Sequence, residues 1–127
     1  FNKRTKFPVI DLMDSQRAIK IKGGTMRLGA YDCEIKTGTK TYAAYRKKRI
    51  SERHRHRYEV NNRYRNKLEK NGLIFSGINK DLGVVEAIEV KGHPWYIAGQ
   101  FHPELKSRVN KAHPLFREFI KAAVKTL

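Results

Sequence analysis

In the run of residues 50–60, ISERHRHRYEV, two kinds of side chain alternate strictly, and this alternation is compatible with a β-strand and not with a helix. Its two alternating sets are three arginines and three ring-bearing residues, namely Arg53, Arg55 and Arg57 against His54, His56 and Tyr58. Successive side chains of a β-strand point to opposite faces, whereas a helix repeats every 3.6 residues. The run therefore predicts a strand with one basic face and one face of rings.

Strand and helix patterns alternate along the rest of the chain. Mostly apolar segments at residues 7–13, 21–35, 73–78, 82–90 and 93–101 favour short strands, with a loop at Gly23 and Gly24 in the second. Thr39 or Thr41 is placed to cap one short helix, and Asn61 or Asn62 a second helix that Gly72 ends. With no internal repeat and no linker, these patterns predict one continuous α/β unit.

The C-terminal segment has the pattern of an amphipathic helix. Pro114 lies where a first helical residue is favoured, because proline lacks the N–H that would be unpaired there. The apolar residues that follow fall on one stripe, namely Phe116, Phe119, Ile120, Ala123 and Leu127.

The charge balance and the cysteine count narrow the class of protein. The 127 residues carry 28 basic and 12 acidic side chains, a formal net charge of +16 that favours phosphate-bearing or acidic partners. A single cysteine excludes an internal disulfide framework and a cysteine-rich zinc site, so we expect a reducing, cytoplasmic location. No apolar segment approaches the roughly 20 residues of a membrane span, so no membrane partner is expected.

His102 and Glu104 form a candidate acid–base pair in QFHPEL, residues 100–105. In an extended chain, residues i and i+2 lie on the same face, and Pro103 is expected to keep the chain extended between them. A carboxylate beside an imidazole fixes its tautomer and stabilises the imidazolium, as in a catalytic triad. A loop histidine beside a chance acid is the alternative for so short a motif.

Four motifs in one order resemble the CTP synthase family. They are GGTMRLG at residues 23–29, ERHRHRYEVN at 52–61, HPWYIAGQFHPE at 93–104 and HPLFREFIKAA at 113–123. The resemblance covers residues 1–127 and indicates the C-terminal portion of a class I glutamine amidotransferase domain. It implies a flavodoxin-like α/β fold with a central, mostly parallel sheet, here incomplete because its front half is missing.

The resemblance also implies roles for three residues. His102 and Glu104 match the base and orienter of a Cys-His-Glu triad that hydrolyses glutamine, and Arg57 matches the position that binds the substrate. A planar guanidinium suits that task because it pairs with a carboxylate bidentately. From the residues alone, a solvated strand edge or a phosphate-binding stripe is the preferred interpretation of RHRHR, and flanking arginines disfavour a metal site at His54 and His56.

The family's nucleophilic cysteine, in a G-x-C-x-G elbow, has no counterpart here. Cys33 lies between Asp32 and Glu34, whose charges disfavour a thiolate, so we expect it to be a small buried side chain. Because the chain begins at Phe1 instead of methionine, we expect a longer parent that supplies the elbow. This stretch alone is then expected to be inactive.

For the parent, the resemblance implies synthesis of CTP from UTP with ATP, Mg²⁺ and glutamine-derived ammonia. Partners implied are glutamine, an N-terminal synthetase domain that holds ATP and Mg²⁺, GTP as activator, and a homotetramer, with no cofactor or metal in this stretch. The alternative is a basic nucleic-acid-binding module, suggested by the +16 charge and by the aromatic residues among arginines in RHRHRY. Because no known nucleic-acid motif is present, we do not expect that partner.

Overall fold

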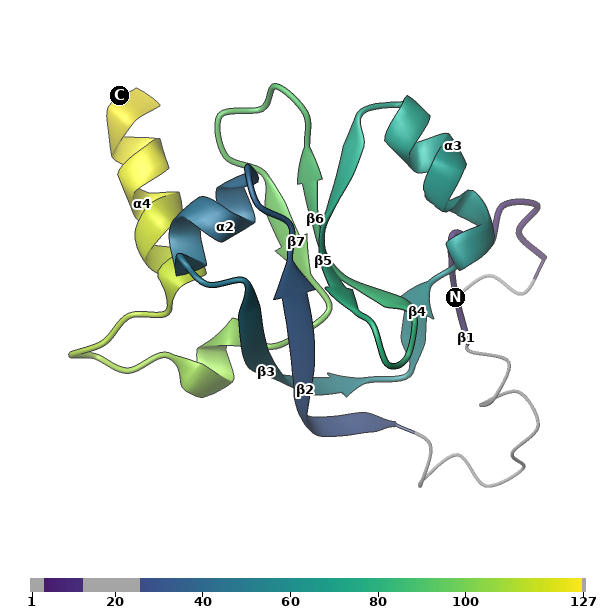
Figure 1. Ribbon diagram of the computed structural model, residues 1–127, viewed down its shortest axis with the longest axis horizontal. Helices are drawn as coiled ribbons and strands as arrows, with labels where there is room; N and C mark the ends of the chain where they lie inside the picture. The colour runs from purple at the N-terminus through teal and green to yellow at the C-terminus, as the bar shows by residue number, and fades with distance from the viewer. Residues whose placement is uncertain (1–3, 13–25, 127) are drawn as a thin grey trace.

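The structure, a computed structural model, describes residues 4–12 and 26–126 (Figure 1). The predictions for Met13, for the loop at Gly23 and Gly24, and for Leu127 lie outside the described residues. No helix in the described part has the length and apolar character that a membrane span requires.

Five strands form the main sheet, and every ladder between them is antiparallel. The strands are β2 (Arg27–Ile35), β3 (Arg49–His56), β5 (Leu73–Asn79), β6 (Val84–Val90) and β7 (Ile97–Gly99), in the order β3-β2-β5-β6-β7. β1 (Ile10–Leu12) and β4 (Tyr58–Val60) form a separate antiparallel pair. The mostly parallel pairing expected from the resemblance is therefore not found within residues 4–12 and 26–126. A tight turn joins β5 to β6, and such a turn can join only antiparallel strands.

Two short helices begin where capping side chains were predicted. Thr39, and not Thr41, caps α2 (Lys40–Tyr45), since its Oγ1 accepts a hydrogen bond from the Tyr42 N–H at 3.1 Å. Asn61 caps the 3₁₀ turn η2 (Asn62–Tyr64), which leads into α3 (Arg65–Lys70). Polar residues before each helix thus set where it starts.

The C-terminal helix α4 (Pro114–Thr126) starts at proline as predicted. It lies beside α2 (Figure 1), and Nη2 of Arg117 donates to the Ala44 carbonyl at 3.3 Å. The predicted apolar stripe forms but is not buried, since Phe116, Phe119 and Ile120 are 40%, 52% and 58% exposed.

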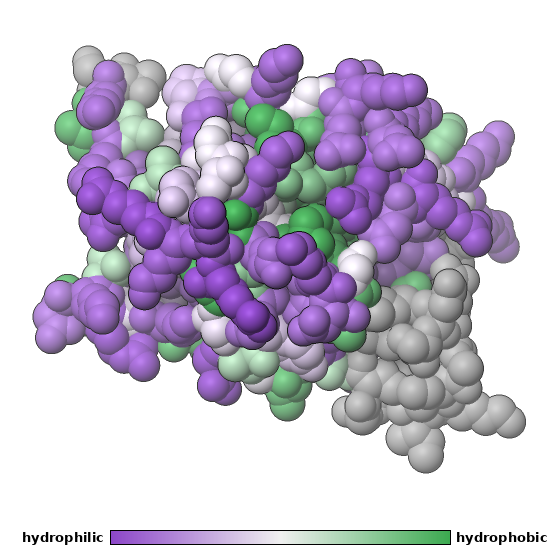
Figure 2. Space-filling view, in the orientation of Figure 1, coloured by the Kyte–Doolittle hydropathy of each residue, from purple (hydrophilic) through white to green (hydrophobic). Residues whose placement is uncertain are grey.

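The apolar core is small and contains buried polar groups. Cys33, Ile35 and Ile50 form its centre, with Tyr42 and Tyr45 packed against them. Several glutamates and histidines are as buried as this core, namely Glu52, His54, Glu59, Glu86, Glu89 and His113. Hydrophilic side chains cover most of the face seen in Figure 2, with hydrophobic atoms showing between them. Buried charge of this kind requires specific partners, which lie around the candidate site.

Candidate active site

His102 and Glu104 meet in a tight turn that follows β7. Nδ1 of His102 lies 2.6 Å from Oε1 of Glu104, and the two side chains are 40% and 57% exposed. The predicted contact is confirmed, but the predicted extended backbone is wrong. The 3₁₀ helix η3 (Pro103–Lys106) starts at Pro103 instead, because proline's fixed φ also suits a first helical residue, and His102 occupies the N-cap position without a side-chain capping hydrogen bond.

This contact fixes the chemistry of the imidazole. The backbone N–H of Glu104 and the His102 ring both lower the pKa of the Glu104 carboxyl, which is therefore ionised at neutral pH. An ionised carboxylate only accepts hydrogen bonds, so His102 must donate from Nδ1. In the neutral ring, Nε2 is then the basic atom, as in the base of a catalytic triad.

Strand β3 holds the η3 turn in place through its main chain. The His102 N–H donates to the Arg53 carbonyl at 2.8 Å, and Nζ of Lys106 donates to the Ser51 carbonyl. Lys106 also lies 3.7 Å from the buried Glu52 carboxylate, with which it forms an ion pair. Both ends of the turn that carries His102 and Glu104 are thus fixed to one strand.

Glu52 in turn connects β3 to two helical segments. Its Oε1 accepts a hydrogen bond from the Tyr45 hydroxyl at 3.0 Å and lies 3.1 Å from Nε2 of His113. Nδ1 of His113 accepts the Leu115 N–H at 3.3 Å, so a neutral ring carries its proton on Nε2 and donates it to Glu52. The start of α4 is therefore fixed to the same strand as the η3 turn.

Arg57 departs from the predicted alternation. Arg53 and Arg55, both exposed, lie on one face of β3 and the buried His54 lies on the other, so the predicted alternation holds there, but β3 ends at His56 and Arg57 lies in the bend before β4. Arg57 is half-buried, and within the described part of the chain its Nε is buried with no hydrogen-bond partner. A buried donor of this kind favours binding of an acceptor such as a carboxylate.

No hydrogen bond or ion pair joins Arg57 to His102 or Glu104 among the described residues. Arg53, whose carbonyl accepts the His102 N–H, precedes Arg57 by four residues, which is about 13 Å of extended chain. The structure therefore places Arg57 one residue beyond the end of the strand whose Arg53 carbonyl accepts the His102 N–H.

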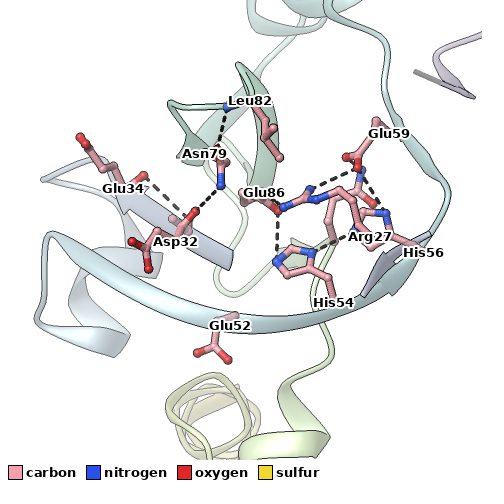
Figure 3. A network of polar contacts seen from close by, with 12 residues as sticks. Arg27, Asp32, Glu34, Glu52, His54, His56, Glu59, Asn79, Leu82 and Glu86 are labelled. Atoms are coloured by element: carbon pink, nitrogen blue, oxygen red, sulfur yellow. Dashed lines mark hydrogen bonds and ion pairs between the residues drawn. The ribbon is translucent and has the colours of Figure 1, made fainter. Parts of the chain in front are cut away.

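His54 and His56 hydrogen-bond to each other. Nδ1 of His54 lies 2.8 Å from Nε2 of His56, and both rings join a buried cluster with Arg27, Glu59 and Glu86 (Figure 3). Among residues 4–12 and 26–126, no three histidine, cysteine, aspartate or glutamate residues are arranged to hold a metal ion.

Cys33 is a buried core residue, as predicted, being 1% exposed. Burial, followed by the charges of Glu86 and Glu52, raises the pKa of its thiol to about 12. Burial is thus the main cause, and of the two flanking acids that the sequence suggested, Glu34 also raises the thiol pKa, by less than Glu86 and Glu52 do. A thiol with such a pKa is not a nucleophile at neutral pH.

Sequence reasoning missed Lys106, which holds the η3 turn, and the buried polar contacts among Arg27, Glu59, Glu86 and Gln100. One signal was available, because Glu86 and Glu89 interrupt the apolar strand segment VVEAIEV. A carboxylate in such a segment requires a buried partner. The identity of that partner depends on strand pairing, which the segment does not specify.

Comparisons with known proteins identify the family of the chain. The family model for class I glutamine amidotransferases matches residues 8–122. CTP synthases of Pelodictyon phaeoclathratiforme and Chloroflexus aurantiacus are 60% and 59% identical over 97% and 100% of the chain. The chain spans only 22% and 23% of those two relatives.

A solved structure shows the same fold. The glutaminase domain of Trypanosoma brucei CTPS with bound acivicin matches with a TM-score of 0.89 and 35% identity, over 98% of this chain and 49% of that one. The α/β fold class predicted above is therefore confirmed. The family match shows that the chain belongs to the class I glutamine amidotransferase family, and within that family it is similar to the glutaminase region of CTP synthases.

Proposed function

We propose that residues 1–127 form the C-terminal portion of the glutaminase domain of a CTP synthase and supply the proton-transfer half of its active site. The observation that carries this proposal is the 2.6 Å contact between His102 and Glu104, in a chain about 60% identical to CTP synthases. Glutamine would be hydrolysed to glutamate and ammonia at this site.

His102, Glu104 and Arg57 have distinct tasks in this reaction. Nε2 of His102 accepts the proton of an attacking thiol and later donates it to the departing ammonia. Glu104 keeps the ring in the Nδ1–H tautomer and stabilises the imidazolium. Arg57 binds the glutamine α-carboxylate through its guanidinium, which has a buried donor available.

The thiol itself is proposed to come from outside residues 1–127. Cys33 is the only cysteine in the sequence, and its burial and raised pKa prevent that role. The chain alone would then hydrolyse no glutamine, because the acyl-enzyme cannot form without a nucleophile.

The other parts of the reaction are proposed for the parent protein. ATP, Mg²⁺ and UTP would bind a synthetase domain N-terminal to this region, GTP would activate, and the parent would be a homotetramer. The described residues contain no group of side chains suited to a metal ion, so we assign no metal ligand here.

The test is the substitution His102→Ala in the full-length polypeptide. We expect the rate of glutamine hydrolysis to fall by about three to six orders of magnitude, as when the base of a triad is removed. Synthesis of CTP from added ammonia should remain, because ammonia bypasses the glutaminase site. The matched control is His93→Ala, which removes an exposed histidine outside the η3 turn. Full glutamine hydrolysis by the His102 variant would refute the proposal.

A further inference from the structure

A buried polar cluster lies against the segment that leads to His102, and the mechanism above does not use it. Its members come from four strands of the described chain: Arg27 from β2, His54 and His56 from β3, Glu59 from β4 and Glu86 from β6 (Figure 3). Four of the five, all except His56, are at most 4% exposed.

Gln100 and Phe101 connect this cluster to the η3 turn. Nε2 of Gln100 donates to Oε2 of Glu59 at 3.2 Å, and its backbone N–H donates to the Glu86 carbonyl at 2.8 Å. The ring of Phe101 meets the His54 ring edge-on, with centroids 6.0 Å apart. The cluster therefore supports the residues immediately before His102.

Hydrogen-bond direction determines the tautomers of the two histidines. Nδ1 of His56 lies 3.1 Å from the Tyr58 carbonyl, which can only accept, so His56 carries its proton on Nδ1. Nε2 of a neutral His56 then accepts from Nδ1 of His54 at 2.8 Å. A neutral His54 consequently has a bare lone pair on Nε2.

That lone pair faces a carboxyl oxygen. Nε2 of His54 lies 3.5 Å from Oε2 of Glu86, and both atoms are buried without another hydrogen-bond partner. The other oxygen, Oε1, accepts from Nη2 of Arg27 at 2.6 Å. If Glu86 were ionised, two buried acceptors would face each other, whereas a proton on Oε2 turns the contact into a hydrogen bond.

Glu59 provides the contrast, because donors face both of its oxygens. Oε1 lies 3.2 Å from Nη1 of Arg27 and 3.4 Å from the protonated Nδ1 of His56, and Oε2 accepts from Gln100. Burial raises the pKa of Glu59 above its ordinary value in spite of Arg27, which lowers it, while the donors on both oxygens favour the ionised form. An ionised Glu59 balances the charge of Arg27. An ionised Glu86 would be a second buried anion in the cluster without a second cation to balance it.

We propose that Glu86 is a protonated carboxylic acid that donates to Nε2 of His54, and that this neutral pair positions the His102 turn. The first part stands on the contacts alone, and the second rests on the proposed glutaminase function. Glu86 and His54 are thus positioning residues that touch neither substrate nor the reacting atoms.

The directions of the pKa shifts agree with this protonation state. Burial raises the pKa of Glu86 to about 7, and the groups that act on its carboxyl are Arg27, Glu59 and His54. Burial and then Arg27 lower the pKa of His54 to about 3 and that of His56 to about 4, so both rings are neutral.

The consequence is a defined dependence of stability on pH. The folded protein holds this proton more tightly than the unfolded chain, in which the glutamate pKa is 4.5. The contribution of Glu86 to stability is therefore present below pH 4.5 and is lost as pH rises to about 7. Above that pH, a buried anion faces the His54 lone pair beneath the turn.

The test uses the same full-length polypeptide in which glutamine hydrolysis is measured. We expect the infrared spectrum at pH 6 to contain the carbonyl band of a protonated carboxylic acid, and Glu86→Gln to remove it. Because a glutamine amide also donates to Nε2 of His54, Glu86→Gln should remove the loss of stability between pH 5 and pH 8. We also expect kcat/KM of the wild-type protein to fall as Glu86 ionises at alkaline pH, and Glu86→Gln should reduce that fall.

Glu59→Gln is the matched control. It places an amide donor against the donors of Arg27, His56 or Gln100, so it should lower the urea midpoint at every pH. Absence of the carboxylic acid band in the wild-type protein would overturn the inference, because it would put the proton on a histidine. Equal destabilisation by the two substitutions would overturn it as well.

The infrared band separates this inference from the proposed function. A wild-type protein with the band but without glutamine hydrolysis would refute the proposed function and still support a protonated Glu86 that donates to His54. A band with a kcat/KM profile that Glu86→Gln does not change would overturn the positioning role.

Discussion

Gly77 in β5 occupies a position where the interior has no space for a methyl group. A Cβ built there would lie 2.7 Å from Sγ of Cys33, 3.0 Å from Cβ of Ala87 and 3.3 Å from the Ala87 nitrogen. Neighbouring atoms must move to admit it, so we expect Gly77→Ala to cost about 2–3 kcal/mol, in the upper part of the range for overpacking. At a urea m-value of about 2 kcal/mol/M, the unfolding midpoint falls by about 1–1.5 M.

The shortest of these contacts can be relieved separately. Cys33→Ala removes the sulfur and should cost about 1 kcal/mol alone, as the loss of one buried heavy atom does. If the sulfur causes the strain, the double variant should lose less unfolding free energy than the two single variants lose in sum, by about 1 kcal/mol or more. Urea unfolding followed by circular dichroism measures all four proteins of the cycle.

Gly38 supplies the control, since its φ is +77° and no atom lies within 4 Å of its Cβ position. Gly38→Ala is strained through its backbone and should add to Cys33→Ala without coupling. If Gly77→Ala and Cys33→Ala were also additive to within about 0.5 kcal/mol, the packing argument would be refuted.

Four other predictions concern single side chains. Arg57→Lys should raise the KM for glutamine about 10- to 100-fold, with a smaller change in kcat, because lysine cannot pair bidentately. An unchanged KM would contradict this. Glu89→Gln should cost about 2 kcal/mol or more in urea unfolding, because the carboxylate accepts the N–H groups of Lys40 and Thr41 at 3.0 and 2.6 Å and an amide would oppose one of them. By comparison, Thr39→Ala removes the single capping hydrogen bond from the Tyr42 N–H and should lower the free energy of unfolding by only about 1 kcal/mol. Native Cys33 should resist iodoacetamide at pH 8 and react after unfolding, since its pKa is raised to about 12; native alkylation at the rate of a free thiol would disprove its burial.

The sequence was sufficient for features that depend on neighbouring residues. Alternation in residues 50–56 predicted the two faces of β3, and Thr39 and Asn61 marked helix starts. Local rules were less reliable where proline allows two outcomes. Pro103 was expected to extend the chain, but it begins the 3₁₀ helix η3 instead, because the same φ fits both.

Features that depend on strand pairing could not be predicted in this way. The direction of the ladders and the partners of Glu86 are set by which strands become neighbours, and residues 27, 59 and 86 are far apart in the sequence. Arg57 shows the same limit, since the alternating pattern continues through it while β3 ends at His56.

The support of the candidate site comes largely from main-chain groups, which residue types do not reveal. The sequence indicated Arg53 only as a member of a basic face, and its side chain is exposed, yet its carbonyl is the group that accepts the His102 N–H at 2.8 Å. The Ser51 carbonyl holds Lys106 in the same way. Because both acceptors lie on β3, the position of the η3 turn depends on the strand's backbone, and that backbone is held by the buried side chains of Glu52 and His54. The polar residues on the buried face of β3 therefore determine the geometry of a pair that none of them touches.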